Sequence, residues 1–307
     1  MVADNASNAL KIEDIKTVLI LGCGTLGLRV GLQAALSGYQ VKMYDIHEAA
    51  QQKAQHIQGK VLNYLQRHDA ITEEEGNAAV ARIFWTTDAA KAAEGVDFVN
   101  ESVTEELGLK RKVWEQFGRL CPEHTLFTTN TSYLLPSQLA DASGRPERFC
   151  AFHFHDVFTA KVVDIMPHPG TAAWVVPLLK TLGARLQQIP VVLEKENTGY
   201  LFNFMLNAIL GSAAQLLIKG IGSVEDIDRS WMGNFGMPHG PFGLMDEIGL
   251  DTVWHVSVNA KDPKSQQFAN YIKEYVDAGK LGVKTGEGFY TYPNPRYRDP
   301  GFLSAFN

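Results

Sequence analysis

The feature that most constrains the fold is a change of hydrophobic period near residue 195 of this 307-residue chain. Before it, short β-rich runs alternate with helical stretches, the pattern of βαβ units around a mainly parallel sheet. After it, apolar residues recur at helical spacing. This predicts an α/β domain with a doubly wound sheet over 1–194 and a smaller all-α domain over 195–307. The expected strands are 17–22, 39–45, 82–88, 96–102, 125–130, 148–154, 161–166 and 185–192.

The first expected strand runs directly into Gly22-x-Gly24-x-x-Gly27, which opens a helical pattern. In this context the first glycine permits a tight turn, the second lets the backbone approach a pyrophosphate, and the third allows close packing of helix and strand. The helix N-terminus offers free N–H groups and a positive dipole end to that anion. We therefore expect a Rossmann-type dinucleotide site at this turn, with Thr25 and Leu26 part of it.

Asp45 ends the second expected strand, 21 residues after Gly24. A carboxylate at this point can accept hydrogen bonds from a ribose 2′-hydroxyl and would repel a 2′-phosphate. Ile46 and His47 follow it, where an arginine would be needed to accommodate that phosphate. The sequence therefore predicts NAD as the cofactor and not NADP.

Polar residues at strand ends are the candidates for catalysis, because ligands collect at the carboxyl edge of open α/β sheets. Ser132 follows the fifth expected strand, His153 lies 21 residues later in the sixth, and Asp164 lies 11 residues after His153 in the seventh. A histidine with a carboxylate partner can accept a proton, since the carboxylate fixes the tautomer and stabilises the imidazolium. From spacing alone, His155 and His168 compete for this role, and either pairing could be a structural contact.

Charge and cysteine content argue against several classes of protein. The chain has 28 Lys plus Arg against 34 Asp plus Glu, a formal charge of −6, and no basic run, so nucleic acid is not an expected partner. Cys23, Cys121 and Cys150 are odd in number and form no Cys-x-x-Cys pair. Neither a disulfide framework nor a metal site is predicted, and a reducing, cytoplasmic location fits best.

The stretch 198–218 carries no charge and approaches the length of a membrane span. It holds four Asn, Ser or Gln residues, so we expect a helix buried inside a domain or a dimer interface, with no membrane partner.

Residues 48–81 are long for one crossover helix and predict a helical hairpin with its tip at 68–76. Lys53, Lys60 and Arg67 recur every seven residues and therefore lie on nearly one face of a helix. Such a row is ordinarily a solvated face. The alternative is a binding surface for the phosphate groups of a phosphorylated substrate.

The order and spacing of several motifs over nearly the whole chain resemble the L-3-hydroxyacyl-coenzyme A dehydrogenase family. The motifs are VLILGCGTLG, EELGLK, TTNTSYL, AFHF, NTGYLFN, MPHGPFGLMDEIGLD and KTGEGFYTY. The resemblance implies a Rossmann domain that binds NAD, followed by a helical domain that mediates homodimerisation. It also implies reversible oxidation of a secondary alcohol β to a carboxyl derivative, with a 3-hydroxyacyl thioester as the small-molecule substrate.

Matching the motifs position by position implies roles for individual residues. His153 would be the catalytic base, and Asp164 stands where the family has its glutamate partner. Ser132 and Asn203 would hydrogen-bond the reacting oxygen. The positions that help to seat NAD would be Ser132, Glu105, Lys110 and Lys284.

One departure from the family pattern concerns the partner of the base. After His-Phe the family continues Phe-Asn-Pro, whereas this chain reads His155-Asp156-Val157, and the stretch before Asp164 is one residue shorter. Aspartate also lacks a methylene relative to glutamate. We expect the strand to shift so that Asp164 still reaches His153.

A second departure concerns the acyl carrier. The family presents serine and lysine to coenzyme A from the hairpin, but Val61 and His68 occupy those places here. Lys60 and Arg67 lie one position away, about 100° round the helix, and are the candidates to bind the carrier.

Two alternative functions stay open. One is an NAD-dependent dehydrogenase or reductase of free or esterified 3-hydroxy acids or diketo esters, since relatives with such activities share the architecture. The other is a non-catalytic NAD-binding structural protein, against which the retention of all four catalytic candidates argues.

Overall fold

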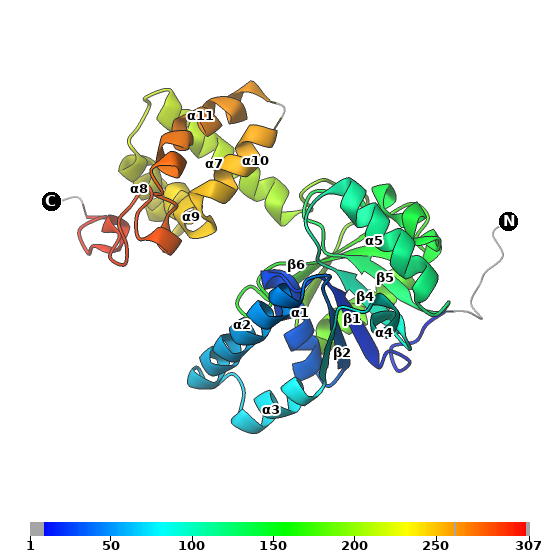
Figure 1. Ribbon diagram of the computed structural model, residues 1–307. Helices are drawn as coiled ribbons and strands as arrows, with labels where there is room; N and C mark the ends of the chain where they lie inside the picture. Colours follow the sequence, from blue (N-terminus) through cyan, green and yellow to red (C-terminus); the bar gives the residue numbers. More distant parts are fainter. Residues whose placement is uncertain (1–8, 261, 305–307) are drawn as a thin grey trace. The chain divides into compact units, whose positions relative to one another are not determined.

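The computed structural model describes residues 9–260 and 262–304. This part of the chain forms two compact units that divide between Leu201 and Phe202, a few residues after the change of hydrophobic period (Figure 1). The first unit is a sheet with helices on both faces, and the second is helical. Both fold classes are those that the sequence predicted.

Within the described residues, eight strands form one sheet in the order β3-β2-β1-β4-β5-β6-β7-β8. All neighbouring strands pair in parallel except β6 and β7, which are antiparallel. The first six positions reproduce the strand order of a dinucleotide-binding sheet. Each strand overlaps one of the eight expected runs. The strands are β1 (Thr17–Leu21), β2 (Gln40–Tyr44), β3 (Ile83–Thr86), β4 (Phe98–Glu101), β5 (Leu126–Thr129), β6 (Phe149–Phe154), β7 (Val162–Pro167) and β8 (Ile189–Val192).

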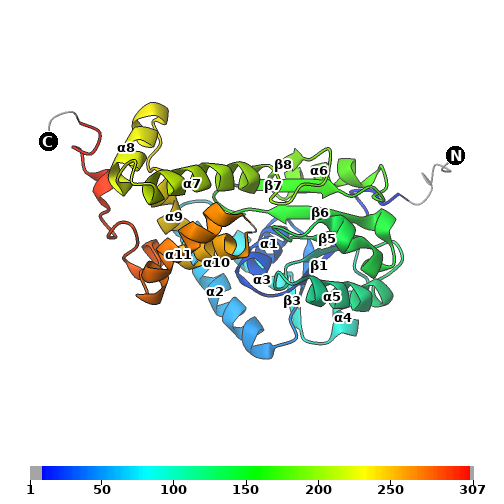
Figure 2. The ribbon, with the colours of Figure 1, turned by 90° about the horizontal axis from the view of Figure 1, so that it is seen from above.

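Helices cover both faces of the sheet because its central strands are apolar on both sides (Figure 2). In β1, Val18 and Ile20 join one core while Leu19 and Leu21 join the other, as the alternation of side chains along a strand requires. The first core is shared with α1 (Thr25–Leu36), α2 (Glu48–Arg67), α3 (Glu73–Ala81) and α6 (Val175–Arg185), and the second with α4 (Ala89–Ala93) and α5 (Leu107–Leu120).

The parallel strands β1, β4, β5 and β6 end at the same edge of the sheet. There the turn after β1 approaches the end of β4, and the Asn130 amide after β5 donates to Ser102 Oγ after β4 at 3.1 Å. The segments that carry the predicted cofactor turn and the predicted serine are thus neighbours.

The predicted helical hairpin is confirmed, as α2 and α3. Thr72 caps α3 through a capping box, in which Glu75 N donates to Thr72 Oγ1 at 3.1 Å and Thr72 N donates to Glu75 Oε2 at 2.7 Å. Because this box starts α3 at Glu73, the connection between the helices is residues 68–72, and the expected tip, which reached residue 76, was too long.

The second unit packs five helices around buried aromatic side chains and two buried aspartates. Asp228 accepts from the Phe242 and Gly243 N–H groups at 2.8 and 2.9 Å, and Asp246 accepts from Phe289 and Tyr290 N–H at 2.9 Å each. These carboxylates satisfy backbone donors in the interior of the unit. The helices are α7 (Phe202–Ile218), α8 (Val224–Phe235), α9 (Pro241–Ile248), α10 (Leu250–Asn259) and α11 (Pro263–Asp277).

Helix α7 covers most of the uncharged stretch noted in the sequence. Among the described helices, none has the length and apolar content to cross a membrane. Within its own chain α7 buries Leu210, Ala213 and Ala214, whereas Phe204 and Met205 are more than half exposed. The expectation of a helix buried inside the domain therefore holds for one face only.

The segment after Tyr292 packs onto the helical unit. Tyr297 and Phe302 are 4% and 2% exposed. Arg229 Nε donates to the Phe302 carbonyl at 2.7 Å, and its guanidinium lies 4.6 Å from the centre of the Phe302 ring. The sequence assigned this segment no role, and the structure shows that its aromatic residues belong to the core of the unit.

We expect Phe302→Ala to lower the free energy of unfolding by about 3 to 5 kcal/mol, the usual cost of deleting a buried aromatic side chain. The measurement is urea unfolding followed by circular dichroism. The adjacent Leu303, which is 52% exposed, provides the control, because Leu303→Ala should change the free energy by less than about 0.5 kcal/mol. Equal effects of the two substitutions would contradict this account of the segment.

Candidate active site

In the glycine turn after β1, two of the three glycines have no room for a Cβ. Gly22 has φ +100°, and a Cβ there would lie 2.7 Å from the Ser102 carbonyl oxygen. A Cβ on Gly27 would lie 2.1 Å from the Gly22 carbonyl oxygen. A Cβ on Gly24 would meet nothing within 4 Å, so the backbone is open on that side. This is the arrangement that lets a pyrophosphate approach the turn.

The first turn of α1, which begins at Thr25 and Leu26, holds no acidic residue, and Gly24 supplies no side-chain cap. Its N–H groups are therefore available to an anion. Asp45 is half-buried beside the turn, and its carboxylate accepts from Cys23 N and His47 N at 3.0 Å each. Because a carboxylate can accept further hydrogen bonds, Asp45 can also bind a ribose hydroxyl. The residues present fit a dinucleotide.

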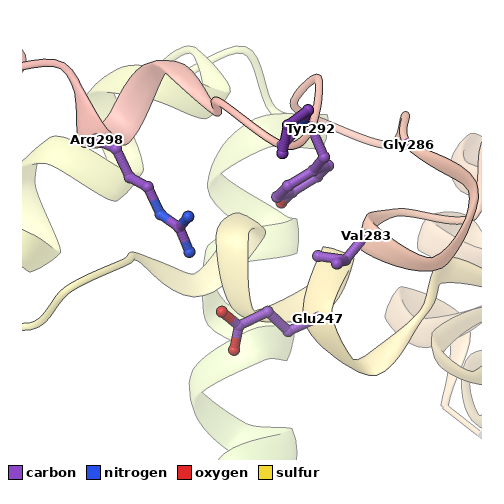
Figure 3. A pocket seen from close by; sticks show the side chains of 6 residues that line it. Glu247, Val283, Gly286, Tyr292 and Arg298 are labelled. Atoms are coloured by element: carbon purple, nitrogen blue, oxygen red, sulfur yellow. The ribbon is translucent and has the colours of Figure 1, made fainter.

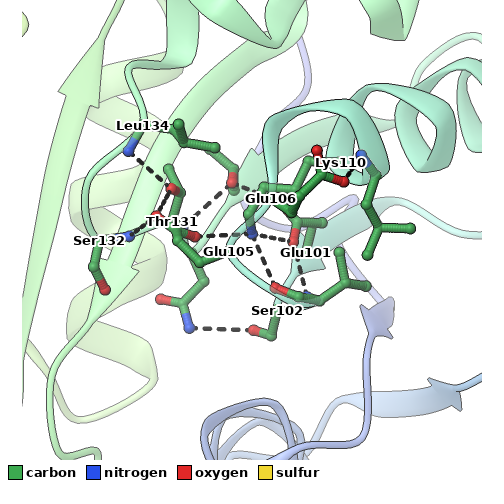
Figure 4. Close-up of polar contacts among 12 residues, drawn as sticks. Glu101, Ser102, Glu105, Glu106, Lys110, Thr131, Ser132 and Leu134 are labelled. Carbon is green, nitrogen blue, oxygen red and sulfur yellow. Dashed lines mark hydrogen bonds and ion pairs between the residues drawn. The ribbon is translucent and has the colours of Figure 1, made fainter. Parts of the chain in front are cut away.

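Glu105 holds the loop that carries Ser132 (Figure 4). Its Oε1 accepts from Ser132 N and Tyr133 N at 3.0 Å each, and also from the Thr131 hydroxyl. Partial burial alone would raise the pKa of Glu105, but the Lys110 ammonium and the hydrogen bonds outweigh it, so the pKa lies below its usual value. Glu105 is therefore ionised near neutral pH, and it positions the predicted serine.

Lys110 supports this loop from inside the protein. It is 1% exposed, and its Nζ lies 2.6 Å from Glu101 Oε1, 3.3 Å from Glu105 Oε2 and 3.1 Å from the Val103 carbonyl oxygen. Burial raises the pKa of Glu101, while the Lys110 ammonium and the Thr129 hydroxyl oppose that rise. The Lys110 ammonium thus contacts Glu101, Glu105 and the Val103 carbonyl. Through Glu105, these contacts connect α5 to the Ser132 loop.

Ser132, His153 and Asp164 form one chain of contacts. The Ser132 hydroxyl lies 3.2 Å from His153 Nε2, and His153 Nδ1 lies 3.3 Å from Asp164 Oδ2. The antiparallel register of β6 and β7 places His153 directly opposite Asp164, so both side chains lie on the same face of the sheet. The shorter carboxylate therefore reaches the histidine, as expected. Asp156, which accepts from two backbone N–H groups at 2.9 and 3.0 Å, closes the shortened connection between the strands.

The His153 ring is enclosed on its flat side by Tyr200. The two rings stack with their centres 4.4 Å apart and an interplanar angle of 12°, and the Tyr200 hydroxyl donates to the Thr131 carbonyl at 2.7 Å. His153 is 3% exposed, and this burial lowers its pKa below the ordinary value, although Asp164 acts in the opposite direction. His153 is consequently neutral near pH 7 and can accept a proton at Nε2.

The geometry distinguishes the two other candidate histidines. His155 Nε2 lies 2.7 Å from the same Asp164 Oδ2. His168, by contrast, hydrogen-bonds the Pro146 carbonyl and Gly170 N at 2.9 and 3.1 Å, which is a structural contact. Burial alone would raise the pKa of Asp164, but the hydrogen bonds to both imidazoles lower it below its usual value.

Among the described residues, one group of side chains could hold a metal ion, although the sequence predicted no such site. It consists of His153, His155 and Asp164, which offer ligand atoms within 4.8 Å of one another. All three are already joined by hydrogen bonds through the Asp164 carboxylate.

Two predicted residues lie in the helical unit. Asn203 is half-buried in the first turn of α7. Lys284, in the short 3₁₀ turn Val283–Thr285, pairs with Asp251, whose Oδ2 lies 2.6 Å from the Lys284 Nζ. This ion pair is nearly half exposed.

A hollow of about 540 Å³ opens within the helical unit (Figure 3). The Arg298 guanidinium and the Glu247 carboxylate face it, and Arg298 belongs to the segment after Tyr292. Among the described residues that line the hollow, none is a predicted catalytic or cofactor residue. The lining residues are Glu247, Val283, Gly286, Tyr292, Pro293 and Arg298.

Sequence reasoning missed two residues of the site in the sheet unit. Glu101 ends the apolar strand β4, and a lone carboxylate at the end of a buried strand was a signal for it. Tyr200 follows Gly199 in the NTGYLFN motif, where no pattern of residue types indicates that its ring will stack on a histidine from β6.

Comparisons with known proteins agree with this geometry. Residues 17–197 match the family described as 3-hydroxyacyl-CoA dehydrogenase, NAD binding domain. Residues 199–292 match 3-hydroxyacyl-CoA dehydrogenase, C-terminal domain. The chain is 31% identical over 302 residues to the mitochondrial hydroxyacyl-coenzyme A dehydrogenase of Homo sapiens, covering 94% of this chain and 95% of that protein.

Two solved structures extend the similarity to the fold. A diketoreductase is 37% identical with a TM-score of 0.88, covering 91% of this chain and 99% of that chain. The (S)-3-hydroxybutyryl-CoA dehydrogenase of Ralstonia eutropha is 32% identical with a TM-score of 0.80, covering 91% of this chain and 100% of that chain. With its glycine turn, its Ser132–His153–Asp164 contacts and both family matches, the chain belongs to the 3-hydroxyacyl-CoA dehydrogenase family, whose cofactor is NAD.

Proposed function

We propose that this protein is an NAD-dependent oxidoreductase that interconverts L-3-hydroxyacyl-CoA and 3-ketoacyl-CoA. The observation that carries the proposal is the contact chain from Ser132 Oγ through His153 to Asp164. The same unit has, after β1, a glycine turn that fits a dinucleotide. A neutral, buried histidine with a carboxylate partner is suited to accept a hydroxyl proton.

In the proposed reaction, NAD supplies the hydride acceptor when it is bound. His153 Nε2 takes the proton of the substrate hydroxyl, and Asp164 stabilises the imidazolium that forms. We assign Ser132 and Asn203 to hydrogen bonds with the reacting oxygen. In the reverse direction His153 returns the proton to the ketone oxygen.

We assign the cofactor to the turn of Gly22, Gly24 and Gly27 and to the ribose contact of Asp45. Glu105, held by Lys110, would seat the cofactor by holding the Ser132 loop beside it. Lys284 is assigned to the cofactor by its place in the KTGEGFYTY motif.

We assign the acyl carrier to the cations of α2. Lys53, Lys60 and Arg67 are all exposed on this helix, so their charges are available to phosphate groups. Val61 is half-buried, and the His68 ring packs on Tyr64 with ring centres 4.1 Å apart. Lys60 and Arg67 are therefore better placed than Val61 and His68 to bind a carrier.

A second candidate is the reduction of diketo compounds or the oxidation of free 3-hydroxy acids. The similarity to the diketoreductase favours it, because both the identity of 37% and the TM-score of 0.88 exceed those of the hydroxybutyryl-CoA dehydrogenase described above. The chemistry at His153 would be the same, and only the group beyond the reacting carbon would differ.

We further propose a homodimer in the cytoplasm. The exposed Phe204, Met205 and Leu216 side chains of α7 support a dimer, since exposed apolar patches mark interfaces. The cysteines Cys23, Cys121 and Cys150 are free and buried, as suits a reducing compartment.

The two candidate substrates are separated by measuring NADH formation from L-3-hydroxybutyryl-CoA and from free 3-hydroxybutyrate, together with NADH oxidation by a 3,5-diketo ester. We expect the highest kcat/KM with the thioester. Turnover of the carrier-free compounds alone would instead establish the second candidate. No turnover of any of the three would contradict both.

The carrier assignment is tested within the same assay. Lys60→Ala and Arg67→Ala should each raise KM for the thioester about two- to fivefold, the usual strength of an exposed ion pair, and leave KM for free 3-hydroxybutyrate unchanged. Lys180→Ala, which removes an exposed cation from α6, is the matched control. A similar change in all three variants would refute a specific carrier site.

The role of His153 predicts the pH dependence of the oxidation. Because the base must be neutral, activity is lost as pH falls through its pKa, which burial places below 6.5. We expect the midpoint of the acidic limb of the kcat/KM profile to lie below that pH. Asp164→Asn should move this midpoint to a still lower pH and reduce kcat about a hundredfold.

His153→Ala should abolish turnover and leave NAD binding intact. Normal turnover in that variant would exclude His153 as the base.

The role of Asp45 predicts a change in cofactor affinity. Asp45→Ala should raise KM for NAD about ten- to a hundredfold, the cost of hydrogen bonds to a charged group, with little effect on KM for substrate. Asp45→Asn keeps one acceptor oxygen for the Cys23 amide and should raise KM for NAD less. An unchanged KM for NAD in both variants would rule out the ribose contact.

A further inference from the structure

One carboxylate oxygen of Asp164 is shared by two histidines. Oδ2 lies 2.7 Å from His155 Nε2 and 3.3 Å from His153 Nδ1. The shorter contact is in the range of a charge-assisted hydrogen bond, whereas the contact to the proposed base is longer than the usual N–H···O distance. The stronger of the two partners of Asp164 is thus the histidine that does not touch Ser132.

The period of β6 explains this arrangement. His153 and His155 are two residues apart, so their side chains leave the strand on the same face, and their rings meet edge to face with centres 4.8 Å apart. Asp164 lies opposite His153 on β7 and is 1% exposed. His155 N also donates to the Val162 carbonyl at 3.2 Å, so the sheet pairing continues to this residue and limits where its ring can lie.

Asp164 needs such a partner because its side chain is short. An aspartate can rotate about its Cα–Cβ bond, and a single long contact to His153 restrains that rotation weakly. A second donor on the same oxygen fixes the carboxylate at the distance where it can accept from His153.

We propose that His155 is a positioning residue for the catalytic base, whose Nε2–H holds the Asp164 carboxylate where it accepts a hydrogen bond from His153 Nδ1–H. The inference rests on the proposed function, since it assumes that His153 takes the proton. His155 thereby supplies a restraint that the single 3.3 Å contact to His153 does not provide. It acts through Asp164 and has no assigned contact with substrate or cofactor.

The test replaces His155 with phenylalanine, an aromatic residue without a hydrogen-bond donor. We expect His155→Phe to lower kcat about ten- to a hundredfold, because small misplacements of a catalytic group have effects of this size. KM for NAD and for substrate should stay within about twofold, since the proposed role of His155 is exerted through Asp164. Melting temperature and NAD affinity, measured on the same preparations, show whether the variant is folded. An unchanged kcat in folded His155→Phe would overturn the proposal.

Two further variants separate positioning from packing. Adding Asp164→Glu to His155→Phe should recover most of the lost kcat, because the longer carboxylate reaches His153 without help. His155→Gln keeps a side-chain N–H donor and should retain more kcat than His155→Phe. A double variant no faster than His155→Phe, or a glutamine variant no better than phenylalanine, would show that His155 acts through packing and would overturn the proposal.

His168 provides the matched control. It is also a nearly buried histidine with two hydrogen bonds, but its partners are the Pro146 carbonyl and Gly170 N. We expect His168→Phe to lower the melting temperature and leave kcat unchanged well below that temperature. A kcat loss equal to that of His155→Phe would mean that any buried histidine in this region has the same effect, which would overturn the proposal.

The same three side chains could instead serve a divalent cation. Dialysis of the wild-type protein against EDTA, followed by assay with and without added zinc, distinguishes the two. We expect no change after EDTA. Activity lost to EDTA and restored by zinc would overturn the positioning role. Turnover that survives His153→Ala would refute the proposed function itself, so the two failures are distinguishable.

Discussion

The parallel pairing of β1, β4, β5 and β6 is the constraint on which the site of the first unit depends. Because parallel strands end at one edge of the sheet, the glycine turn after β1, Ser102 after β4 and the Ser132 loop after β5 become neighbours. The single antiparallel pair, β6 with β7, then brings a carboxylate opposite the histidine. A sheet parallel throughout would carry that carboxylate on a strand running the other way, in a different register.

Buried charges keep the loops of this edge in place. Lys110 lies between Glu101 and Glu105, and Glu105 accepts three hydrogen bonds from the Ser132 loop. Burying an ion pair costs desolvation free energy, which only close contacts and further hydrogen bonds offset. Here each carboxylate has hydrogen-bond donors besides the lysine, so the cluster is satisfied and holds one geometry. The cluster of Glu101, Glu105 and Lys110 thereby holds Ser132 in a defined position.

The groups proposed for proton transfer and the cations proposed for the acyl carrier lie in different parts of the first unit. The groups proposed for proton transfer, His153 and Asp164, lie on β6 and β7 inside the sheet, where burial lowers the pKa of His153 and hydrogen bonds to two imidazoles lower that of Asp164. The cations proposed for the carrier lie on the exposed face of α2, where substitution leaves the core unchanged. This separation is compatible with relatives that are named for CoA thioesters and for diketo compounds and that share one fold.

The sequence by itself determined the eight strands, the helical hairpin, the helical second half and the glycine turn, because period, glycine and capping residues are local properties of the chain. It also predicted Ser132, His153 and Asp164 as catalytic residues through the family motifs, since spacing alone left His155 and His168 as alternatives. Only the tertiary structure decided which histidines contact Asp164, since this depends on the register of β6 against β7, and a shift of one residue would turn the side chains to the other face. Tyr200 and Lys110 were likewise placed by packing between segments distant in sequence, which no local pattern encodes.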